Sequence, residues 1–443
     1  MRKHTYIGLA GLVLAGSLNA CNPLKVEPVA NPNAASVGDV AVNASKAQLD
    51  ALAIGQIGVA RNGLATYLQV LGTIGKELFN FNTTESRWMT ELNGTRPIDN
   101  SAFYNGATTA FGLPVRQANI TLASVANTNS VTDVQKSGYK GLANTFKGLA
   151  YLYMLNAQGT NGVRLNVEDP FKPSKAATYA ESLVGIAKIL DDGATQLDGA
   201  GTSFPFVLPA SYAGFNTPAT FKKFNRAIAL RVAIYQADWT KAATLLPQTF
   251  YSATGDLNVG PQHSFNASNP DVPNPLLNSS TVRIVGTQKL FDDMEAGDKR
   301  KSKVQTLAAP LNYTSGIVYS SKYLSAKYPD VNGSVPIIRN EELVLIAAEI
   351  AAQQNNVAEA TKNINIVRTA AGLANYIGAT TKDALIDAIL KERLYSLFYE
   401  GHRWVDMRRY NKLGEIYLPV ANMKVLERLE RPIAEVNWDL QNP

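Results

Sequence analysis

The C-terminal third of the chain contains two long helical stretches that decide the fold. Residues 339–373 read RNEELVLIAAEIAAQQNNVAEATKNINIVRTAAGL, and residues 392–413 read ERLYSLFYEGHRWVDMRRYNKL. Apolar residues recur every three or four positions, as at Ile364, Val367 and Ala371. This spacing puts the side chains on one face of an α-helix, so each helix is expected to pack on a neighbour.

Short breaks separate these helices and indicate how they are arranged. Asn355 and Asn356 interrupt the first stretch, and Gly401 separates a helix over 385–400 from the next one. Helix pairs with such breaks favour a mainly α fold of stacked, tetratricopeptide-like hairpins. No consensus of about 34 residues recurs, so the pattern alone also allows an irregular helical bundle.

The residues around Gly401 have a structural explanation. Glycine suits the left-handed backbone that ends many helices. Arg403, Asp406 and Arg408 are spaced to form charged hydrogen bonds with neighbouring helices. Trp404 is most simply a core residue. We therefore expect this motif to hold the last helices against the scaffold, not to bind a ligand.

Three segments lack the helical rhythm: 77–106, 199–217 and 251–340. The last spans about ninety residues rich in Asn, Pro, Ser, Gly and Tyr, with short strand-like runs only, such as 281–285 and 316–319. Long loop-rich regions in compact proteins are usually functional. We expect an irregular lobe laid against the helices within a single domain over 45–443.

The N-terminus has the pattern of a secreted lipoprotein. Arg2 and Lys3 precede a short apolar run, which is typical of a signal peptide over residues 1–20. The sequence Leu-Asn-Ala-Cys that ends at Cys21 resembles a bacterial lipobox, so Cys21 is the predicted lipid attachment site. Residues 21–44 are then an extended, lipidated tether. The alternative is that Cys21 is an incidental free thiol.

Composition excludes several classes of function. The chain has 443 residues, 46% of them hydrophobic, and a net charge of +6, which becomes 6 − 2 = +4 without Arg2 and Lys3. The basic residues are scattered, so nucleic acid is not an expected partner. One Cys and three His residues give no metal cluster or disulfide. No catalytic motif or cofactor motif is present, which predicts a binding protein and not an enzyme.

The two C-terminal stretches resemble the signature of the SusD/RagB family. In the first, a helix with an acidic pair precedes a helix with Asn-x-Val-Arg and a Gly-Leu stop; the second is similar to the family's Glu-Gly-x-Arg-Trp-x-Asp stretch. Weaker similarities lie at 150–165, at 224–242 and in the terminal VNWDLQNP. The resemblance therefore extends over the mature chain.

This resemblance implies a function at the cell surface. Members of the family sit on the outer face of the outer membrane, capture a nutrient and pass it to a SusC-type TonB-dependent transporter. The expected ligand is an oligosaccharide. Two alternatives stay open: the same role for peptides, as in the RagB branch, and a helical-repeat scaffold without a ligand.

Sugar capture would have a definite chemical form. Aromatic rings stack on the C–H faces of sugar rings, while Asn, Gln and Arg side chains satisfy the hydroxyl groups. The predicted ligand-binding residues, all in the loop segments, are Arg87, Trp88, Asn93, Tyr104, Phe206, Tyr212, Phe215, Tyr313, Tyr319 and Tyr323. Asn105, Phe204 and Tyr328 are further candidates. The alternative for each ring is that it fills an apolar gap beneath a loop.

Overall fold

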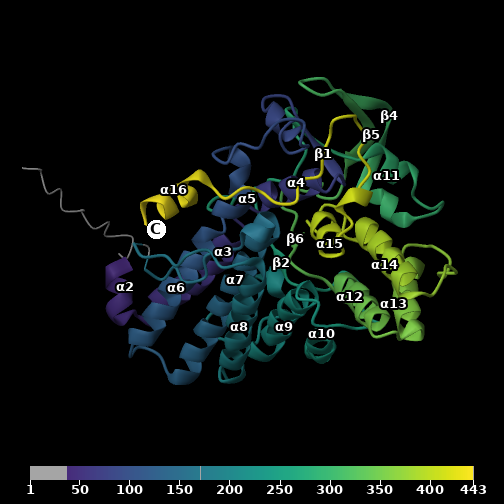
Figure 1. Ribbon diagram of the computed structural model, residues 1–443. Helices are drawn as coiled ribbons and strands as arrows, with labels where there is room; N and C mark the ends of the chain where they lie inside the picture. The colour runs from purple at the N-terminus through teal and green to yellow at the C-terminus, as the bar shows by residue number, and fades with distance from the viewer. Residues whose placement is uncertain (1–36, 170, 443) are drawn as a thin grey trace, which may run out of the picture.

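The computed structural model describes residues 37–169 and 171–442. Its larger part is a stack of helices in which α6, α7, α8, α9 and α10 lie side by side (Figure 1). The prediction of a mainly α fold is confirmed. The helices of this part are α3 (Lys46–Ala60), α4 (Leu64–Ile74), α6 (Gly112–Asn127), α7 (Asp133–Gln158), α8 (Tyr179–Asp198), α9 (Pro218–Tyr235) and α10 (Trp239–Leu245).

Local sequence explains where the central helices begin. The Thr132 hydroxyl accepts the Gln135 backbone N–H at 3.3 Å, and the Gln135 side chain accepts the Thr132 N–H at 3.0 Å. Thr178 and Glu181 repeat this reciprocal arrangement at the start of α8. Such capping boxes satisfy backbone donors that have no partner inside the helix. They fix the first turns of α7 and α8.

A second group of helices continues the stack with the C-terminal signature. It comprises α12 (Asn340–Gln353), α13 (Val357–Ala370), α14 (Lys382–Ser396) and α15 (Arg403–Arg409). The predicted apolar faces are buried, as at Ile364 and Leu390. Trp404 has no exposed surface, and Gly401 has a left-handed φ of 79°. These two observations agree with the structural explanation of the motif, and Asp406 pairs with Arg393 of α14 at 2.7 Å as expected, whereas Arg403 forms no ion pair among the described residues.

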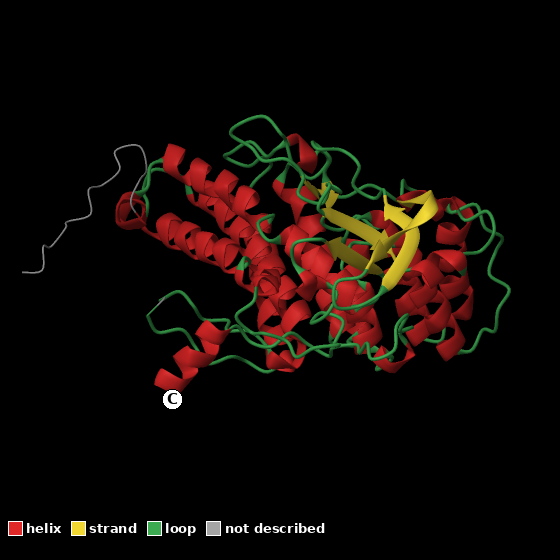
Figure 2. Cartoon of the chain, turned by 90° about the horizontal axis from the view of Figure 1, so that it is seen from above, coloured by secondary structure: helices red, strands yellow, loops and turns green. Residues whose placement is uncertain are grey.

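The lobe opposite the helical stack contains a four-stranded antiparallel sheet (Figure 2). Its order is β1-β3-β5-β4, with Leu78 opposite Gly286, Val285 opposite Leu324, and Val304 opposite Ser325. The strands are β1 (Leu78–Asn82), β3 (Val282–Gly286), β4 (Val304–Tyr313) and β5 (Tyr319–Ser325); smaller elements are α5 (Gly106–Thr109), β2 (Gln262–His263), α11 (Gln288–Asp292) and β6 (Val335–Pro336).

This sheet makes the lobe more regular than the sequence predicts. The strand-like run at 281–285 corresponds to β3, whereas the ten residues of β4 are not expected as a strand. β4 is an edge strand with mostly solvent-facing side chains, a proline at 310 and a register shift between Thr306 and Leu311. Edge strands tolerate proline and irregular pairing, so they show little apolar alternation.

The expected tether is shorter than residues 21–44. Residues Val37–Asn43 form helix α2, which packs on α6 through buried Val40. The Asn127 side chain also donates to the Ala41 carbonyl at 2.8 Å. An apolar contact and a polar contact thus favour helix over an extended chain here. The signal peptide, Cys21 and the first part of the tether lie outside the described residues.

At the other end of the chain, α16 (Ile433–Gln441) stands at the margin of the helical stack (Figures 1 and 2). Within the described ranges, no helix is both long enough and apolar enough to span a bilayer.

Candidate functional site

The structure buries nearly all of the predicted ligand-binding residues. Asn93 is buried and donates to the Met89 carbonyl at 3.1 Å. The eight predicted rings, each at most 8% exposed, are Trp88, Tyr104, Phe206, Tyr212, Phe215, Tyr313, Tyr319 and Tyr323; Asn105, Phe204 and Tyr328 are buried as well. A ring enclosed by protein presents no face to a sugar. The gap-filling alternative therefore describes these side chains in this structure.

These rings also lie in separate clusters. Tyr212 packs with Phe221 and Phe224 between α7 and α9, at centroid distances of 6.3 and 6.4 Å. Tyr319 packs on Phe79 of β1 at 4.6 Å, inside the lobe sheet. The structure therefore does not bring the predicted rings together around one ligand. They pack loops against the scaffold, and this packing removes their apolar surfaces from water.

Arg87 is the one predicted residue whose side chain reaches the surface, with 35% of it exposed. Its guanidinium donates to both Glu85 carboxylate oxygens, at 2.9 and 2.7 Å, and lies 3.6 Å from Asp99. It also lies over the partly exposed Phe103 ring, 5.3 Å from the centroid. We call Glu85, Arg87, Asp99 and Phe103 the Arg87 cluster.

The Arg87 cluster has the chemistry that a polar ligand requires. Hydrogen bonding from Arg87 holds the pKa of Glu85 below its usual value, so this carboxylate is ionised near neutral pH. The Phe103 ring rests on Trp88 and Tyr104, at 4.8 and 5.2 Å. An ionised acceptor, a planar donor and a supported ring thus meet on the lobe surface.

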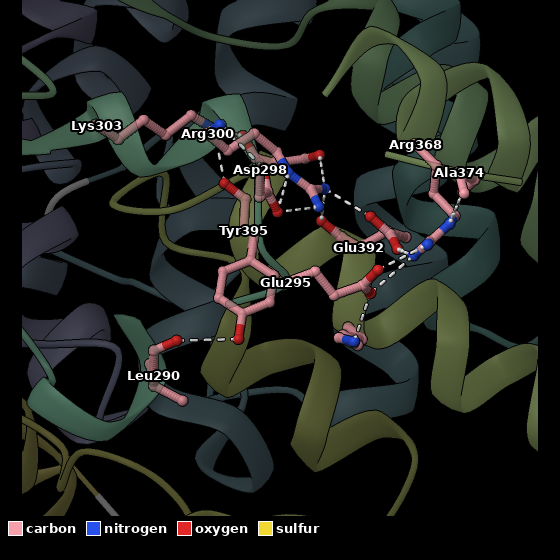
Figure 3. Close-up of polar contacts among 11 residues, drawn as sticks. Leu290, Glu295, Asp298, Arg300, Lys303, Arg368, Ala374, Glu392 and Tyr395 are labelled. Carbon is pink, nitrogen blue, oxygen red and sulfur yellow. Dashed lines mark hydrogen bonds and ion pairs between the residues drawn. The ribbon is translucent and has the colours of Figure 1, made fainter. Parts of the chain in front are cut away.

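A buried charge network attaches the lobe to the C-terminal helices (Figure 3). Glu392 of α14 accepts from Arg300 at 2.6 Å and from Arg368 at 2.9 Å. Arg300 also donates to Asp298 at 2.7 Å, and Arg368 donates to Glu295 at 2.8 Å. Hydrogen bonds from Arg368 lower the pKa of Glu295 to about 2. Since these charges are paired with one another, the network attaches the lobe to the C-terminal helices. Few of its hydrogen-bonding groups remain for a ligand.

A sizeable cavity lies elsewhere, beneath α16. This cavity, the α16 groove, has a volume of about 790 Å³ and is bounded by α6, α7, the 163–173 segment and α16. Its walls are mainly apolar and include Ile120, Met154, Val167 and Trp438. Ligand sites typically combine such walls with a few polar groups.

Two amide side chains supply polar groups to the α16 groove. Neither Oδ1 nor Nδ2 of Asn119 has a hydrogen-bond partner among the described residues, and the same holds for Nε2 of Gln158. All three atoms are buried, although buried polar atoms are normally paired. Asn119 can still accept one hydrogen bond and donate others, and Gln158 can donate.

The roof of the groove is held by ion pairs at its edge. Arg164 approaches Asp439 at 2.6 Å and Glu435 at 3.4 Å, while Arg431 approaches the same two carboxylates at 2.7 and 3.2 Å. We call these four residues the α16 clamp. Hydrogen bonding from Arg164 is the main reason that the pKa of Asp439 lies below its ordinary value.

Trp438 is not among the residues predicted from the sequence to bind a ligand. One signal was available: Ile433, Val436 and Leu440 recur at helical spacing around it. That pattern predicts a short amphipathic helix, but it does not show where the helix lies. For metals, no suitable cluster of three His, Cys, Asp or Glu side chains occurs within residues 37–169 and 171–442.

Comparison with known proteins finds a family match for the C-terminal part of the chain and a shared fold for most of it. The SusD family model matches residues 262–439. Surface glycan-binding protein A from Bacteroides thetaiotaomicron has a similar structure, with a TM-score of 0.69 and 13% identity, over 90% of this chain and 98% of that one. The C-terminal part of the chain therefore matches the SusD family, and the fold as a whole is shared with that protein.

A second structure of that protein and one further relative are also similar to this chain. The same B. thetaiotaomicron protein in complex with laminarihexaose gives a TM-score of 0.63 and 13% identity, over 86% of this chain and 97% of that chain. SusD-like protein P38 from Formosa agariphila is 31% identical over 113 residues. That segment is 24% of this chain and 22% of the relative, so the sequence match covers only a part of either protein.

Proposed function

We propose that this chain is a SusD-family, lipid-anchored cell-surface protein that binds an oligosaccharide and delivers it to a SusC-type TonB-dependent outer-membrane transporter. The observation that carries the proposal is the fold, which matches that of a surface glycan-binding protein over 90% of the chain. Surface glycan-binding protein A has also been solved in complex with laminarihexaose. Glycan binding is thus chemically compatible with this architecture.

The Arg87 cluster is the proposed glycan contact. It lies on the lobe, where the sequence predicts the ligand site, and it contains Arg87, the predicted residue whose side chain is exposed. Glu85 and Asp99 would accept hydrogen bonds from sugar hydroxyls, Arg87 would donate, and the Phe103 face would cover a C–H surface. The buried rings beneath it would keep Phe103 in place.

Calorimetry on the mature chain, residues 22–443, tests this contact. Laminarihexaose and a panel of other oligosaccharides would be titrated into the wild type, Arg87→Ala and Phe103→Ala. We expect either substitution to weaken binding by about tenfold, which corresponds to about 1.4 kcal/mol. Arg428→Ala is the matched control, since Arg428 is also partly buried and donates only to a hydroxyl, that of Thr160.

Two results would count against the glycan contact. Equal affinity in Arg87→Ala and wild type would remove the cluster from the site. Saturable binding of peptides, with none of the glycans bound, would replace the oligosaccharide by the peptide ligand of the RagB-like alternative.

The anchor and the transporter are tested separately. Cys21→Ala should move the protein from the membrane fraction to the soluble fraction, because attachment would depend on the acyl chains. Wild-type protein should co-purify with a TonB-dependent barrel from the membranes of its own bacterium. Unchanged membrane retention of Cys21→Ala would contradict the anchor without affecting the glycan proposal.

A further inference from the structure

Helix α16 is ordered although the rest of the described chain buries little of its surface. It has nine residues, and none of them is buried. Isolated helices shorter than about 12–15 residues are marginal in water. The carboxylates of the α16 clamp are 28% and 35% exposed, and exposed ion pairs contribute only about 0–1 kcal/mol. A helix of this kind is usually stabilised by packing against another surface.

Exposed apolar side chains beside the groove indicate how large a molecule would be needed to cover this surface. Val42 of α2 is 74% exposed, Phe171 is 81% exposed and Leu440 of α16 is 76% exposed. Each belongs to a segment that lines the α16 groove, through Ala41, Pro173 and Trp438 respectively. A small molecule inside the groove would leave these side chains in water. Exposed apolar side chains around a groove are typical of protein interaction sites.

The unpaired side-chain amides of Asn119 and Gln158 indicate which kind of molecule would bind in the α16 groove. Asn119 offers both a donor and an acceptor, and Gln158 offers a donor, so their complement is a group with a carbonyl oxygen and an N–H. A backbone amide has both. In a helix these groups bond to one another, whereas in an extended segment they are free. A glycan fits less well, because apolar walls would leave many of its hydroxyls without partners.

We propose that the α16 groove is the docking site for an extended, apolar segment of a partner protein. The segment lies beneath α16, its side chains pack on Ile120, Met154 and Trp438, and one of its backbone amides pairs with Asn119 and Gln158. This function goes beyond glycan binding and uses a different surface, so either proposal can fail alone. The partner also covers Val42, Phe171 and Leu440.

A peptide probe tests the docking site on the mature chain, residues 22–443. The probe is acetyl-Ala-Leu-Val-Leu-Ala-amide, alongside a version with the central amide N-methylated and a version with Gly in place of both Leu. Binding is followed by calorimetry and by Trp438 fluorescence. We expect saturable binding of the first peptide, and at least about tenfold weaker binding of the other two.

Variants locate the binding. Trp438→Ala and Asn119→Leu should each weaken the first peptide by about tenfold, the second because leucine keeps the volume but loses both hydrogen-bonding atoms. Ile377→Ala is the matched control, since Ile377 is an exposed apolar residue away from the groove. Urea unfolding checks that each variant is folded. Trp438→Phe keeps an aromatic ring and should still bind the first peptide. It serves as a second test if Trp438→Ala does not fold.

Three outcomes would overturn the proposal. The first is no saturable binding of any of the three peptides at millimolar concentration. The second is competition by laminarihexaose, which would make the groove a glycan site. The third is a dimer of the mature chain that Trp438→Ala dissociates in sedimentation velocity, because the occupant would then be a second copy. The first and third outcomes leave the Arg87→Ala test of glycan binding unaffected.

Discussion

The loop-rich lobe and the α16 groove place their aromatic residues in opposite ways. The lobe segments are rich in rings, yet the structure encloses those predicted to bind a ligand and leaves Arg87 and Phe103 at the surface. The groove has one partly exposed ring, Trp438, but it is open and has unpaired amides. Ring content therefore indicates what a loop must bury, whereas a binding surface depends on which rings stay uncovered.

The largest expected effect concerns the buried rings. Tyr212→Ala should lower the free energy of unfolding by about 3–5 kcal/mol, because it opens a cavity among Phe146, Phe221 and Phe224. Urea unfolding measures this loss. Tyr212→Phe should be tolerated, since the buried hydroxyl has no partner among the described residues. Exposed Phe171→Ala should change stability by no more than about 0.5 kcal/mol.

The opposite outcome would change the comparison between the two regions. If Tyr212→Ala kept its stability and lost glycan affinity, the ring would be a ligand platform that the structure shows in a closed form. The lobe would then regain the role that the sequence predicts for it.

The next effect tests how the lobe is attached. Glu392→Gln should destabilise the protein by about 3 kcal/mol, because it removes the buried carboxylate shared by Arg300 and Arg368. Glu359→Gln is the matched control: its carboxylate pairs with Lys362 at the surface, so we expect a change below about 0.5 kcal/mol. Thermal unfolding compares the two. Equal melting temperatures would mean that the network in Figure 3 contributes no net stability.

Some parts of this structure are easier to predict from the sequence than others. Helical periodicity is a local property, so the buried faces at Ile364 and Leu390 and the core position of Trp404 are predictable. The order of the sheet depends on pairing between residues about two hundred positions apart, such as Leu78 and Gly286, which periodicity does not report. Edge strand β4 also lacks the alternation of apolar and polar residues that predicts a strand, because most of its side chains face water.

The candidate sites were less predictable than the fold. Residue type suggests that Arg87 and a nearby ring can bind a ligand, but exposure depends on tertiary packing, which buries Trp88 and exposes part of Phe103. The α16 groove combines residues from α6, α7 and α16 that are about three hundred positions apart. No local pattern in VNWDLQNP shows that Trp438 lines the same groove as Ile120.

An acid titration distinguishes the buried charges of the scaffold from the exposed α16 clamp. Burial alone would raise the pKa of Asp406, but the charges of Arg393 and Arg409 outweigh burial and lower it to about 2 from an ordinary 3.8. A lowered native pKa means that the stabilisation is complete above about pH 4 and is lost as the pH falls towards 2. Asp406 should account for about 2 kcal/mol of that loss.

The measurement is urea unfolding of wild type and Asp406→Asn between pH 5 and pH 2. The variant should lose about 2 kcal/mol less stability than the wild type over this range, because asparagine does not titrate. Asp439→Asn should follow the wild-type profile closely. Although the pKa of Asp439 is also lowered, its side chain is 35% exposed and solvent screens the pair. Parallel profiles for all three proteins would contradict this difference between the regions.

The smallest effect is confined to α16 itself. Asp439→Asn removes one carboxylate of the α16 clamp, which should cost this helix about 0.5 kcal/mol and leave global unfolding unchanged. Hydrogen exchange resolves such local opening, so the amides of residues 433–441 should exchange about twofold faster, while those of α8 keep their rates. Adding the apolar peptide should slow the α16 amides in both proteins, because an occupied groove opposes opening. Slowing confined to the lobe amides would instead place the peptide on the Arg87 side of the molecule.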